Sequence, residues 1–338
     1  MRQSGYRRER LDRGIKVRAD DVFVLVSGRE MLYLAGPRLA ATIALLGFPL
    51  LAPWTGAYWQ TVFLIVVAMM LLAISWAFLE RVGLVSLGQS FFFGVGGYLT
   101  AIGAVYLRLP SFFAVLFGTV AGAVACALLL APVLRLRGVY FSLVTFALPL
   151  LFARIIEATK ILGGTEGFAG VPGLGALPTR QYLLVLALLG TAFAFQRLLD
   201  SDYGLVLRAI RDNDVGVRAS GIPVDRWKFW AVLVGTLPAA FAGSVLATHY
   251  HVVGMSAFSL EYSVLPLTAA VLGGSEMVAG AAVGAALIVP LSEVLRAFGT
   301  LRVVAYCLVL VAVLVGVPEG VFALARRRYH QFERWVPI

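Results

Sequence analysis

The chain has 338 residues, of which 60% are hydrophobic and only 14% are charged, and its formal net charge is +10. Ordinary soluble domains are roughly a quarter charged, so this composition excludes a soluble globular protein and predicts a chain that lies mostly in a membrane. The positive charge does not call for nucleic acid as a partner, because basic cytoplasmic loops of a membrane protein explain it.

Long apolar stretches follow one another along the chain and predict an all-α polytopic membrane protein. The clearest is residues 57–79, which hold no charged side chain. At about 1.5 Å per residue, a helix of this length crosses a hydrocarbon core of roughly 30 Å. We expect about ten membrane segments, some of them broken or re-entrant. They are residues 38–53, 57–79, 84–107, 111–134, 139–161, 181–199, 228–250, 258–274, 277–297 and 301–317.

Lys and Arg residues are distributed unevenly between the two sides that these segments define. With both termini in the cytoplasm, 22 of the 28 Lys and Arg residues lie on the cytoplasmic side, as the positive-inside rule requires. We therefore expect a basic cytoplasmic segment at residues 1–37, a membrane domain at 38–317 and a cytoplasmic tail at 318–338. A charged cytoplasmic loop at residues 200–227 interrupts the membrane domain.

Glycine is concentrated in the third predicted segment, at positions 83, 88, 94, 96, 97 and 103. Each Gly weakens a helix by about 1 kcal/mol relative to Ala. Close helix packing would explain these residues, and so would a broken helix that lines a cavity. The polar neighbours Ser86, Gln89 and Ser90 favour the cavity. For Gly280 and Gly284, which are four residues apart, we favour packing.

Polar side chains also mark the start of the fifth segment and the tip of a late hairpin. Tyr140, Ser142 and Thr145 either line a route or bond to neighbouring backbone, and both readings stay open. The residues predicted to line a translocation path are Ser86, Gly88, Gln89, Ser90, Gly94, Tyr140, Ser142, Thr145 and Glu276.

The loop around residues 203–228 has the pattern of a short amphipathic helix. Ser201 or Asp202 can cap its start, and Gly221 followed by Pro223 ends it. One stripe of this helix is apolar and another is charged, with Val206, Ala209, Ile210 and Val217 on the first and Arg208, Arg211, Asp212 and Arg218 on the second. A helix tied at both ends to membrane segments can serve as a docking element for a soluble partner. A loop that only fixes topology is the alternative.

The sequence contains no motif for ATP binding or catalysis. Lys16, Lys160 and Lys228 are followed by Val, Ile and Phe, so none belongs to a P-loop. Most Glu residues near apolar segments fall at segment ends, whereas ion-coupled carriers usually hold acidic residues deep in the membrane. A transporter of this kind would take its energy from another chain. No cluster of nucleophile, base or metal ligands supports a membrane enzyme, so we expect no catalytic, cofactor-binding or metal-binding residues.

Four stretches, in order, resemble the LivM-type permeases of branched-chain amino-acid ABC importers. The resemblance runs from about residue 63 to residue 322. The stretches are "GLVSLGQSFFFGVGGYLTA" at 83–101, "LRLRGVYFSLVTFAL" at 134–148 with "LGGTEGFAGVPG" at 162–173, "LRAIRDNDVGVRASGI" at 207–222, and "VLGGSEMVAGAAVGAAL" at 271–287 with "VPEG" at 317–320.

This resemblance implies a non-catalytic permease subunit of a bacterial inner membrane. Its partners would be the lipid bilayer, a paralogous second permease chain, two ABC ATPase subunits that bind ATP and Mg, and a periplasmic or surface solute-binding protein. This chain would bind no cofactor and no nucleic acid. The residues implied to couple to the ATPase are Leu205, Val206, Arg208, Ala209, Ile210, Arg211, Asp212, Asn213, Val217 and Gly221.

The solute implied is small and polar, with branched-chain amino acids as the default. Relatives also carry urea, short amides and aromatic acids. The alternative function is a self-sufficient secondary transporter or channel. It predicts transport without ATPase partners and an essential buried carboxylate such as Glu261 or Glu276.

Overall fold

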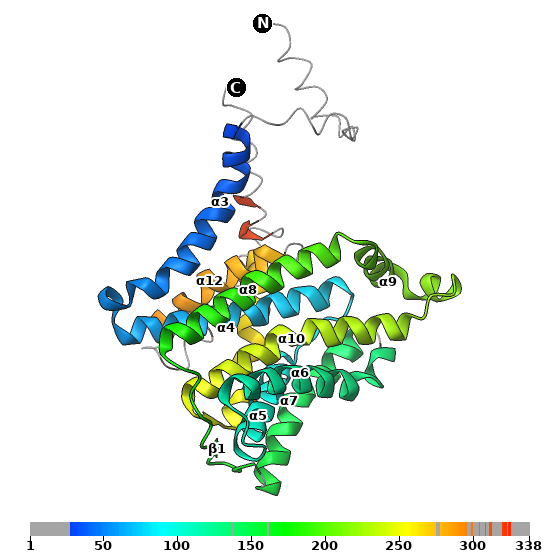
Figure 1. Cartoon of the computed structure of the whole chain (residues 1–338). Helices are drawn as coiled ribbons and strands as arrows, with labels where there is room; N and C mark the ends of the chain where they lie inside the picture. The colour runs from blue at the N-terminus through cyan, green and yellow to red at the C-terminus, as the bar shows by residue number, and fades with distance from the viewer. Residues whose placement is uncertain are drawn as a thin grey trace, which may run out of the picture. The chain divides into compact units, whose positions relative to one another are not determined.

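The structure is a computed structural model that describes residues 28–136, 138–160, 162–274 and 278–295, with the single positions 299, 304, 308, 311, 312, 320–322, 324 and 325. Helices make up most of this described part (Figure 1). The chain divides into two units, Met1–Phe48 and Pro49–Ile338. Glu276 and most of the predicted tenth segment lie outside the described residues.

The first unit contains one described helix, α3 (Gly28–Gly47). This helix begins ten residues before the predicted first segment, and it includes Pro37. The hydroxyl of Thr42 donates to the carbonyl oxygen of Leu39 at 2.9 Å. The 3-10 turn η1 (Phe48–Leu51) follows in the sequence.

The second unit contains nine described helices and one small sheet. The helices are α4 (Ala52–Arg81), α5 (Gln89–Val105), α6 (Ser111–Leu130), α7 (Val139–Thr159), α8 (Leu177–Leu199), α9 (Asp202–Ala219), α10 (Val224–Tyr250), α11 (Glu261–Gly273) and α12 (Val278–Val294). The 3-10 turns η2 (Val133–Arg135) and η3 (Met255–Phe258) precede α7 and α11. In the described part, β1 (Phe168–Ala169) pairs antiparallel with β2 (Val252–Val253) and joins two loops.

Six helical segments of the described chain are long and apolar enough to cross a membrane. They are Gly56–Arg81, Ser111–Leu130, Val139–Thr159, Leu177–Leu199, Val224–Tyr250 and Met255–Gly273. Leu39–Leu51, Gln89–Val105 and Val278–Val294 are shorter apolar helices. Nine of the ten predicted segments fall on these helices. The number of crossings and the side on which each terminus lies stay predictions.

Small residues bring α5, α6 and α10 into close contact at the centre of the second unit. A Cβ atom on Gly96 of α5 would lie 2.6 Å from the Cα of Ala240 in α10, and one on Gly122 of α6 would lie 3.1 Å from the Cα of Gly96. The hydroxyl of Ser244 donates to the carbonyl of Gly96 at 3.2 Å. Gly96 is therefore a packing residue, as is common where membrane helices approach closely.

Packing also explains the two glycines of α12. A Cβ atom on Gly284 would lie 1.9 Å from the carbonyl oxygen of Ala269 in α11, and one on Gly280 would lie 2.5 Å from the carbonyl oxygen of Gly274. The packing role predicted for Gly280 and Gly284 is confirmed.

Large apolar side chains cover the outside of the second unit on α6, α7 and α8. Examples are Phe113, Leu116, Leu143, Leu186 and Phe193, each more than half exposed. Soluble proteins rarely expose continuous apolar surface of this kind. Lipid or another membrane chain would stabilise it, so the exterior supports a polytopic membrane protein.

Candidate functional site

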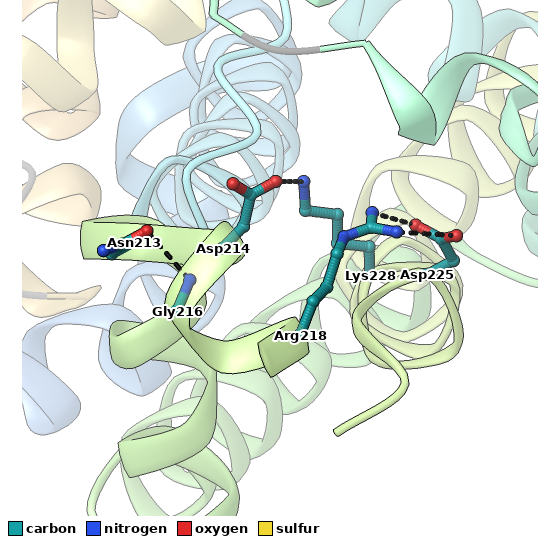
Figure 2. Close-up of polar contacts among 6 residues, drawn as sticks. All are labelled: Asn213, Asp214, Gly216, Arg218, Asp225 and Lys228. Carbon is teal, nitrogen blue, oxygen red and sulfur yellow. Dashed lines mark hydrogen bonds and ion pairs between the residues drawn. The ribbon is translucent and has the colours of Figure 1, made fainter. Parts of the chain in front are cut away.

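The helix α9 lies between the end of α8 and the start of α10, and it is kinked at Asn213 (Figure 1). Asn213 has an extended conformation, with φ −155° and ψ 89°. Its side-chain Oδ1 accepts a hydrogen bond from the Gly216 amide at 3.0 Å (Figure 2), so Asn213 caps the second half of the helix. The sequence predicted one continuous helix here, and the structure corrects it to two short helices in series.

The C-terminal end of α9 matches the sequence prediction, whereas the cap predicted from Ser201 at its N-terminal end is not formed. Ser201 occupies the N-cap position, but its hydroxyl donates to the carbonyl oxygen of Leu198 at 2.6 Å and accepts no bond from the first turn. At the other end, Gly221 has φ +85° and directly follows the C-cap residue Ser220. This left-handed conformation favours Gly, as predicted.

One face of α9 is packed against the protein itself. Ile210 and Val217 form a buried cluster with Val224, the first residue of α10. Only 3% of Ile210 is exposed. Ala209 was predicted on the same stripe but is exposed. Ile210 and Val217 therefore hold α9 in place and are not available to a partner.

Two ion pairs attach the second half of α9 to the first turn of α10 (Figure 2). Lys228 Nζ lies 3.5 Å from Asp214 Oδ2, and only 7% and 12% of these side chains are exposed. Arg218 Nη2 lies 2.5 Å from Asp225 Oδ1, and both side chains of this pair are well exposed. The inner pair is nearly buried and the outer pair is exposed. Removal of one inner partner would therefore leave a charge in a largely buried position, whereas an exposed pair contributes little.

The first half of α9 contacts the end of α4 and the connection from α4 to α5. Arg211 Nη2 lies 3.1 Å from Glu80 Oε1 near the end of α4. A Cβ atom on Gly83 would lie 3.2 Å from the Cα of Arg211. The guanidinium of Arg208 donates to the carbonyl of Leu199, the last residue of α8, at 2.9 Å. Any force on α9 would therefore reach α4, α8 and α10 directly.

The opposite face of α9 is exposed and mixes apolar with charged groups. Seven of the ten predicted coupling residues are exposed, namely Leu205, Arg208, Ala209, Arg211, Asp212, Asn213 and Gly221, and Val206 is half-buried. Tyr203 and Val215 were not predicted, yet they add exposed apolar surface on the same helix. A surface of this composition can bind a soluble protein.

The connection between α4 and α5 is irregular, and its second half, from Ser86 to Gly88, is largely buried although Gly83 and Val85 are exposed. The predicted third segment, residues 84–107, becomes helical only at Gln89. Gln89 Oε1 accepts a hydrogen bond from Ser75 Oγ of α4 at 3.3 Å. Ser75 precedes the end of α4 by six residues, or about 9 Å. The helix break at Gly88 thus lies inside the helical bundle.

Side chains of α4 and α7 satisfy the backbone of this irregular connection. The bonds are those of Trp76 Nε1 to the Ser86 carbonyl at 2.7 Å, Ser142 Oγ to the Val85 carbonyl at 2.7 Å, and the Leu87 amide to Thr145 Oγ1 at 3.1 Å. Non-helical backbone survives at membrane depth only when such partners are present. Ser142 and Thr145, whose two readings the sequence left open, bond to neighbouring backbone in this structure.

Gly88 lies directly against the backbone of α7. Pro149 has no N–H group, so it cannot donate the helical hydrogen bond to the carbonyl of Thr145. A Cβ atom on Gly88 would lie 1.9 Å from that carbonyl oxygen and 2.8 Å from its carbon. Only Gly fits at this position without moving α7.

A second short helix, α11, begins beside the start of α5. The Ser90 amide donates to Ser263 Oγ at 3.0 Å, and Ser263 Oγ donates to Ser90 Oγ at 2.8 Å. The ring of Phe258 fills the notch at Gly94, where a Cβ atom would lie 2.4 Å from the ring. Two helix starts therefore meet in the protein interior, as in transporters with discontinuous helices.

The structure thus gathers seven of the nine predicted path residues around one buried break. They are Ser86, Gly88, Gln89, Ser90, Gly94, Ser142 and Thr145. Tyr140 belongs to α7 as well, but it is 71% exposed. Glu276 lies outside the described residues.

A cavity of about 540 Å³ lies beside the end of α10 that is farther from α9. A helix of 27 residues is about 40 Å long, so the cavity and α9 lie at opposite ends of α10. None of the eight predicted path residues that the structure describes lines the cavity. Its lining comes from Phe93 and Gly97 of α5, Gly243, Leu246, Ala247 and Tyr250 of α10, residues 252–257, Tyr262, Thr165 and Glu166.

Long apolar helices, a buried break where two helix starts meet and an anchored helix with one free face define a membrane permease. Residues 58–318 match the family described as "branched-chain amino acid transport system / permease component". The match covers more than half of the chain, and the chain belongs to this family. This confirms the resemblance seen in the sequence.

The chain is similar to several characterised permeases. It is 26% identical to the high-affinity branched-chain amino acid transport system permease protein LivM of Salmonella typhimurium and 27% identical to that of Escherichia coli, in each case over 72% of this chain and 65% of the relative. It is 29% identical to the xylose/arabinose import permease protein XylH of Sulfolobus acidocaldarius over 44% of this chain and 39% of that relative. No solved structure matches significantly.

Proposed function

We propose that this chain is a membrane-spanning permease subunit of a binding-protein-dependent ABC importer. In this role it pairs with a second permease chain, two cytoplasmic ATPase subunits and a solute-binding protein of the outer face. It translocates a small polar solute and leaves ATP hydrolysis to its partners. The bacterial inner membrane is the corresponding location.

The observation that carries this proposal is the anchoring of α9. A loop that only fixed topology would need positive charge and nothing more. Instead α9 has a buried face of Ile210 and Val217, a buried ion pair to α10 and a contact to Gly83. Its other face is exposed within the described part of the chain. This arrangement supports a docking element that carries force from a soluble partner into the membrane helices.

When the two ATPase subunits bind ATP and close against each other, they would pull on α9. This pull would shift two elements of the membrane domain together. One is α10, through the ion pair of Lys228 with Asp214. The other is the end of α4 with the irregular connection before α5, through Glu80 and Gly83. Both lead to the buried break at Gly88. A switch between outward-facing and inward-facing states at this break follows as a rigid-body displacement of packed helices.

The names of the relatives set the solute class only broadly. Two are named for branched-chain amino acids and one for xylose and arabinose. We propose branched-chain amino acids as the first solutes to test, followed by short amides, urea and aromatic acids.

The direct test is purification of the chain together with the products of neighbouring genes in mild detergent. Under the proposal a second permease and two P-loop ATPases are recovered with it, and uptake in reconstituted vesicles requires ATP. If the chain purifies alone and transports by itself, it is a secondary carrier or a channel and the importer role is wrong.

Leu205→Asp tests the free face of α9. Leu205 is 59% exposed, so the carboxylate stays in water and α9 keeps its place. We expect loss of most ATPase co-purification with an unchanged melting temperature of the chain, because an apolar interface residue has become a charge. Leu107→Asp is the control. Leu107 is 56% exposed and follows the far end of α5, and the ATPase should still bind. Equal ATPase recovery with both variants would remove α9 from the interface.

A further inference from the structure

We infer that the cavity beside Tyr250 is a solute site of this chain, in which Glu166 receives the ammonium group of a solute with an apolar side chain. The inference rests on the proposed permease role and adds to it a site in the membrane subunit itself. The buried break at Gly88 was the region expected from the sequence. The cavity is a different region, lined by different residues.

The position and the volume of the cavity suit a solute site at the entrance of a permease. The cavity lies at the end of α10 farther from α9, and therefore on the outer side if α9 is cytoplasmic. Its volume of about 540 Å³ falls within the range of about 300–1,000 Å³ that is typical of small-molecule sites. Phe93 and Tyr262 line it and stack on each other with ring centroids 4.5 Å apart.

The lining combines apolar walls with one carboxylate. Leu246, Ala247 and Met255 offer apolar surface, and Glu166 carries the only carboxylate among the described lining residues. No Lys, Arg or His lines the cavity in the described part of the chain. A site with this charge attracts an ammonium group and repels a carboxylate.

Local structure holds Glu166 at the cavity. Its amide donates to the Gly163 carbonyl at 3.1 Å and closes a turn. Two residues later, Phe168 pairs with Val253 in the small sheet. On the other side of the loop, the guanidinium of Arg180 donates to the carbonyl of Gly175 at 2.8 Å and lies 2.9 Å from His249 Nδ1 of α10. The carboxylate therefore sits on a loop fixed at both ends.

The floor of the cavity leads toward the buried break. Phe93 follows Ser90 by one helical turn, and Tyr262 precedes Ser263 by one residue. Ser90 and Ser263 are the pair whose hydroxyls meet at 2.8 Å. Tyr262 belongs to the first turn of α11, and Phe93 lies about one turn after the start of α5, so the cavity lining comes within about one turn of both helix starts.

Binding of three probes to the purified full-length chain in lipid nanodiscs tests the inference by saturation-transfer NMR. L-Leucine carries both charges, isopentylamine carries only the ammonium group, and 4-methylpentanoate carries only the carboxylate. We expect leucine and isopentylamine to bind and 4-methylpentanoate not to bind. Ser256→Trp should abolish binding of both amines, because Ser256 lines the cavity and an indole would fill it.

Glu166→Gln keeps the shape of the side chain and removes its charge. We expect the dissociation constant for isopentylamine to rise about threefold to fivefold, because Glu166 is exposed and water screens an ion pair at such a position. Glu157→Gln is the matched control, because Glu157 is a carboxylate of α7 that pairs with Arg154 at 2.6 Å and lies outside the cavity lining. Equal binding of all three probes, or no change with Glu166→Gln, would overturn the inference.

The result is independent of the importer role. Binding is measured on the chain alone, without ATPase or ATP. If amines bind at Glu166 but no ATPase co-purifies, the site stands and the importer proposal fails. If the ATPase co-purifies and no probe depends on Glu166, the importer proposal stands and this site is wrong.

Discussion

Gly88→Ala is expected to abolish most transport while leaving the ATPase contact intact. The added methyl would lie 1.9 Å from the carbonyl oxygen of Thr145 and 2.8 Å from its carbon. Both atoms are backbone, so no change of rotamer relieves the collision. Overpacking of this kind destabilises by about 1–3 kcal/mol. The start of α5 must move away from α7, and the bond from the Leu87 amide to Thr145 is lost with it.

The measurement is solute uptake in vesicles that contain the assembled complex, together with the melting temperature of the purified chain. We expect uptake to fall by about tenfold or more, since each 1.4 kcal/mol changes an equilibrium tenfold. Gly190→Ala is the matched control, because nothing lies within 4 Å of a Cβ atom there. Ala in that helix should be neutral or slightly stabilising. If the two variants behave alike, the contact of Gly88 with α7 has no role in transport.

Much of the fold could be predicted because helices in a membrane follow from local composition. Apolar length predicted the existence of nine helices, although α3 begins ten residues before its predicted segment, and Gly and Ser residues marked the third segment as irregular. The sequence could not show which element would satisfy that irregular backbone. Ser142 and Val85 are 57 residues apart in the chain, and their 2.7 Å contact exists only after α7 has packed against the connection.

The kink in α9 had a local signal that the amphipathic pattern concealed. Asn and Asp compete for backbone hydrogen bonds and are poor in helix interiors, and Asn213 stands between Asp212 and Asp214. The stripe of Val206, Ala209, Ile210 and Val217 assumed one straight helix. Before the kink, Ala209 is exposed and its neighbour Ile210 is buried, and beyond the kink Val217 is buried.

The cavity could not be predicted from the sequence at all. Its lining residues come from segments between Phe93 and Tyr262, and most are ordinary apolar residues that suit a protein core. Glu166 belongs to a short polar loop with no motif of its own. Only the meeting of α5, α10, η3 and this loop in space gives these residues a common surface.

Lys228→Met is expected to release the second half of α9 from α10. The change keeps the length of the side chain and removes its ammonium group. The Asp214 carboxylate, which is only 12% exposed, then loses the ammonium group of Lys228 that lies 3.5 Å away in the native chain. Breaking a buried pair in this way costs about 3–5 kcal/mol. We expect a lower melting temperature and faster amide hydrogen exchange in residues 214–219, with ATP hydrolysis that no longer drives uptake.

Two further variants distinguish the effect of the buried ion pair from the effect of the chain's net charge. Arg218→Ala removes the partner of Asp225. The Arg218 side chain is 40% exposed and that of Asp225 is 46% exposed, and a pair of that kind contributes about 0–1 kcal/mol. This variant should leave exchange and uptake near the wild-type values. The double variant Lys228→Met with Asp214→Leu removes both buried charges, so it should regain most of the lost stability, because the two residues couple strongly. Similar losses in Arg218→Ala and Lys228→Met would mean that net charge, and not the buried pair, holds α9. The double variant can also regain stability without regaining ATP-driven uptake. That result would show that the ion pair itself, and not only the packing around it, transmits force from α9 to α10.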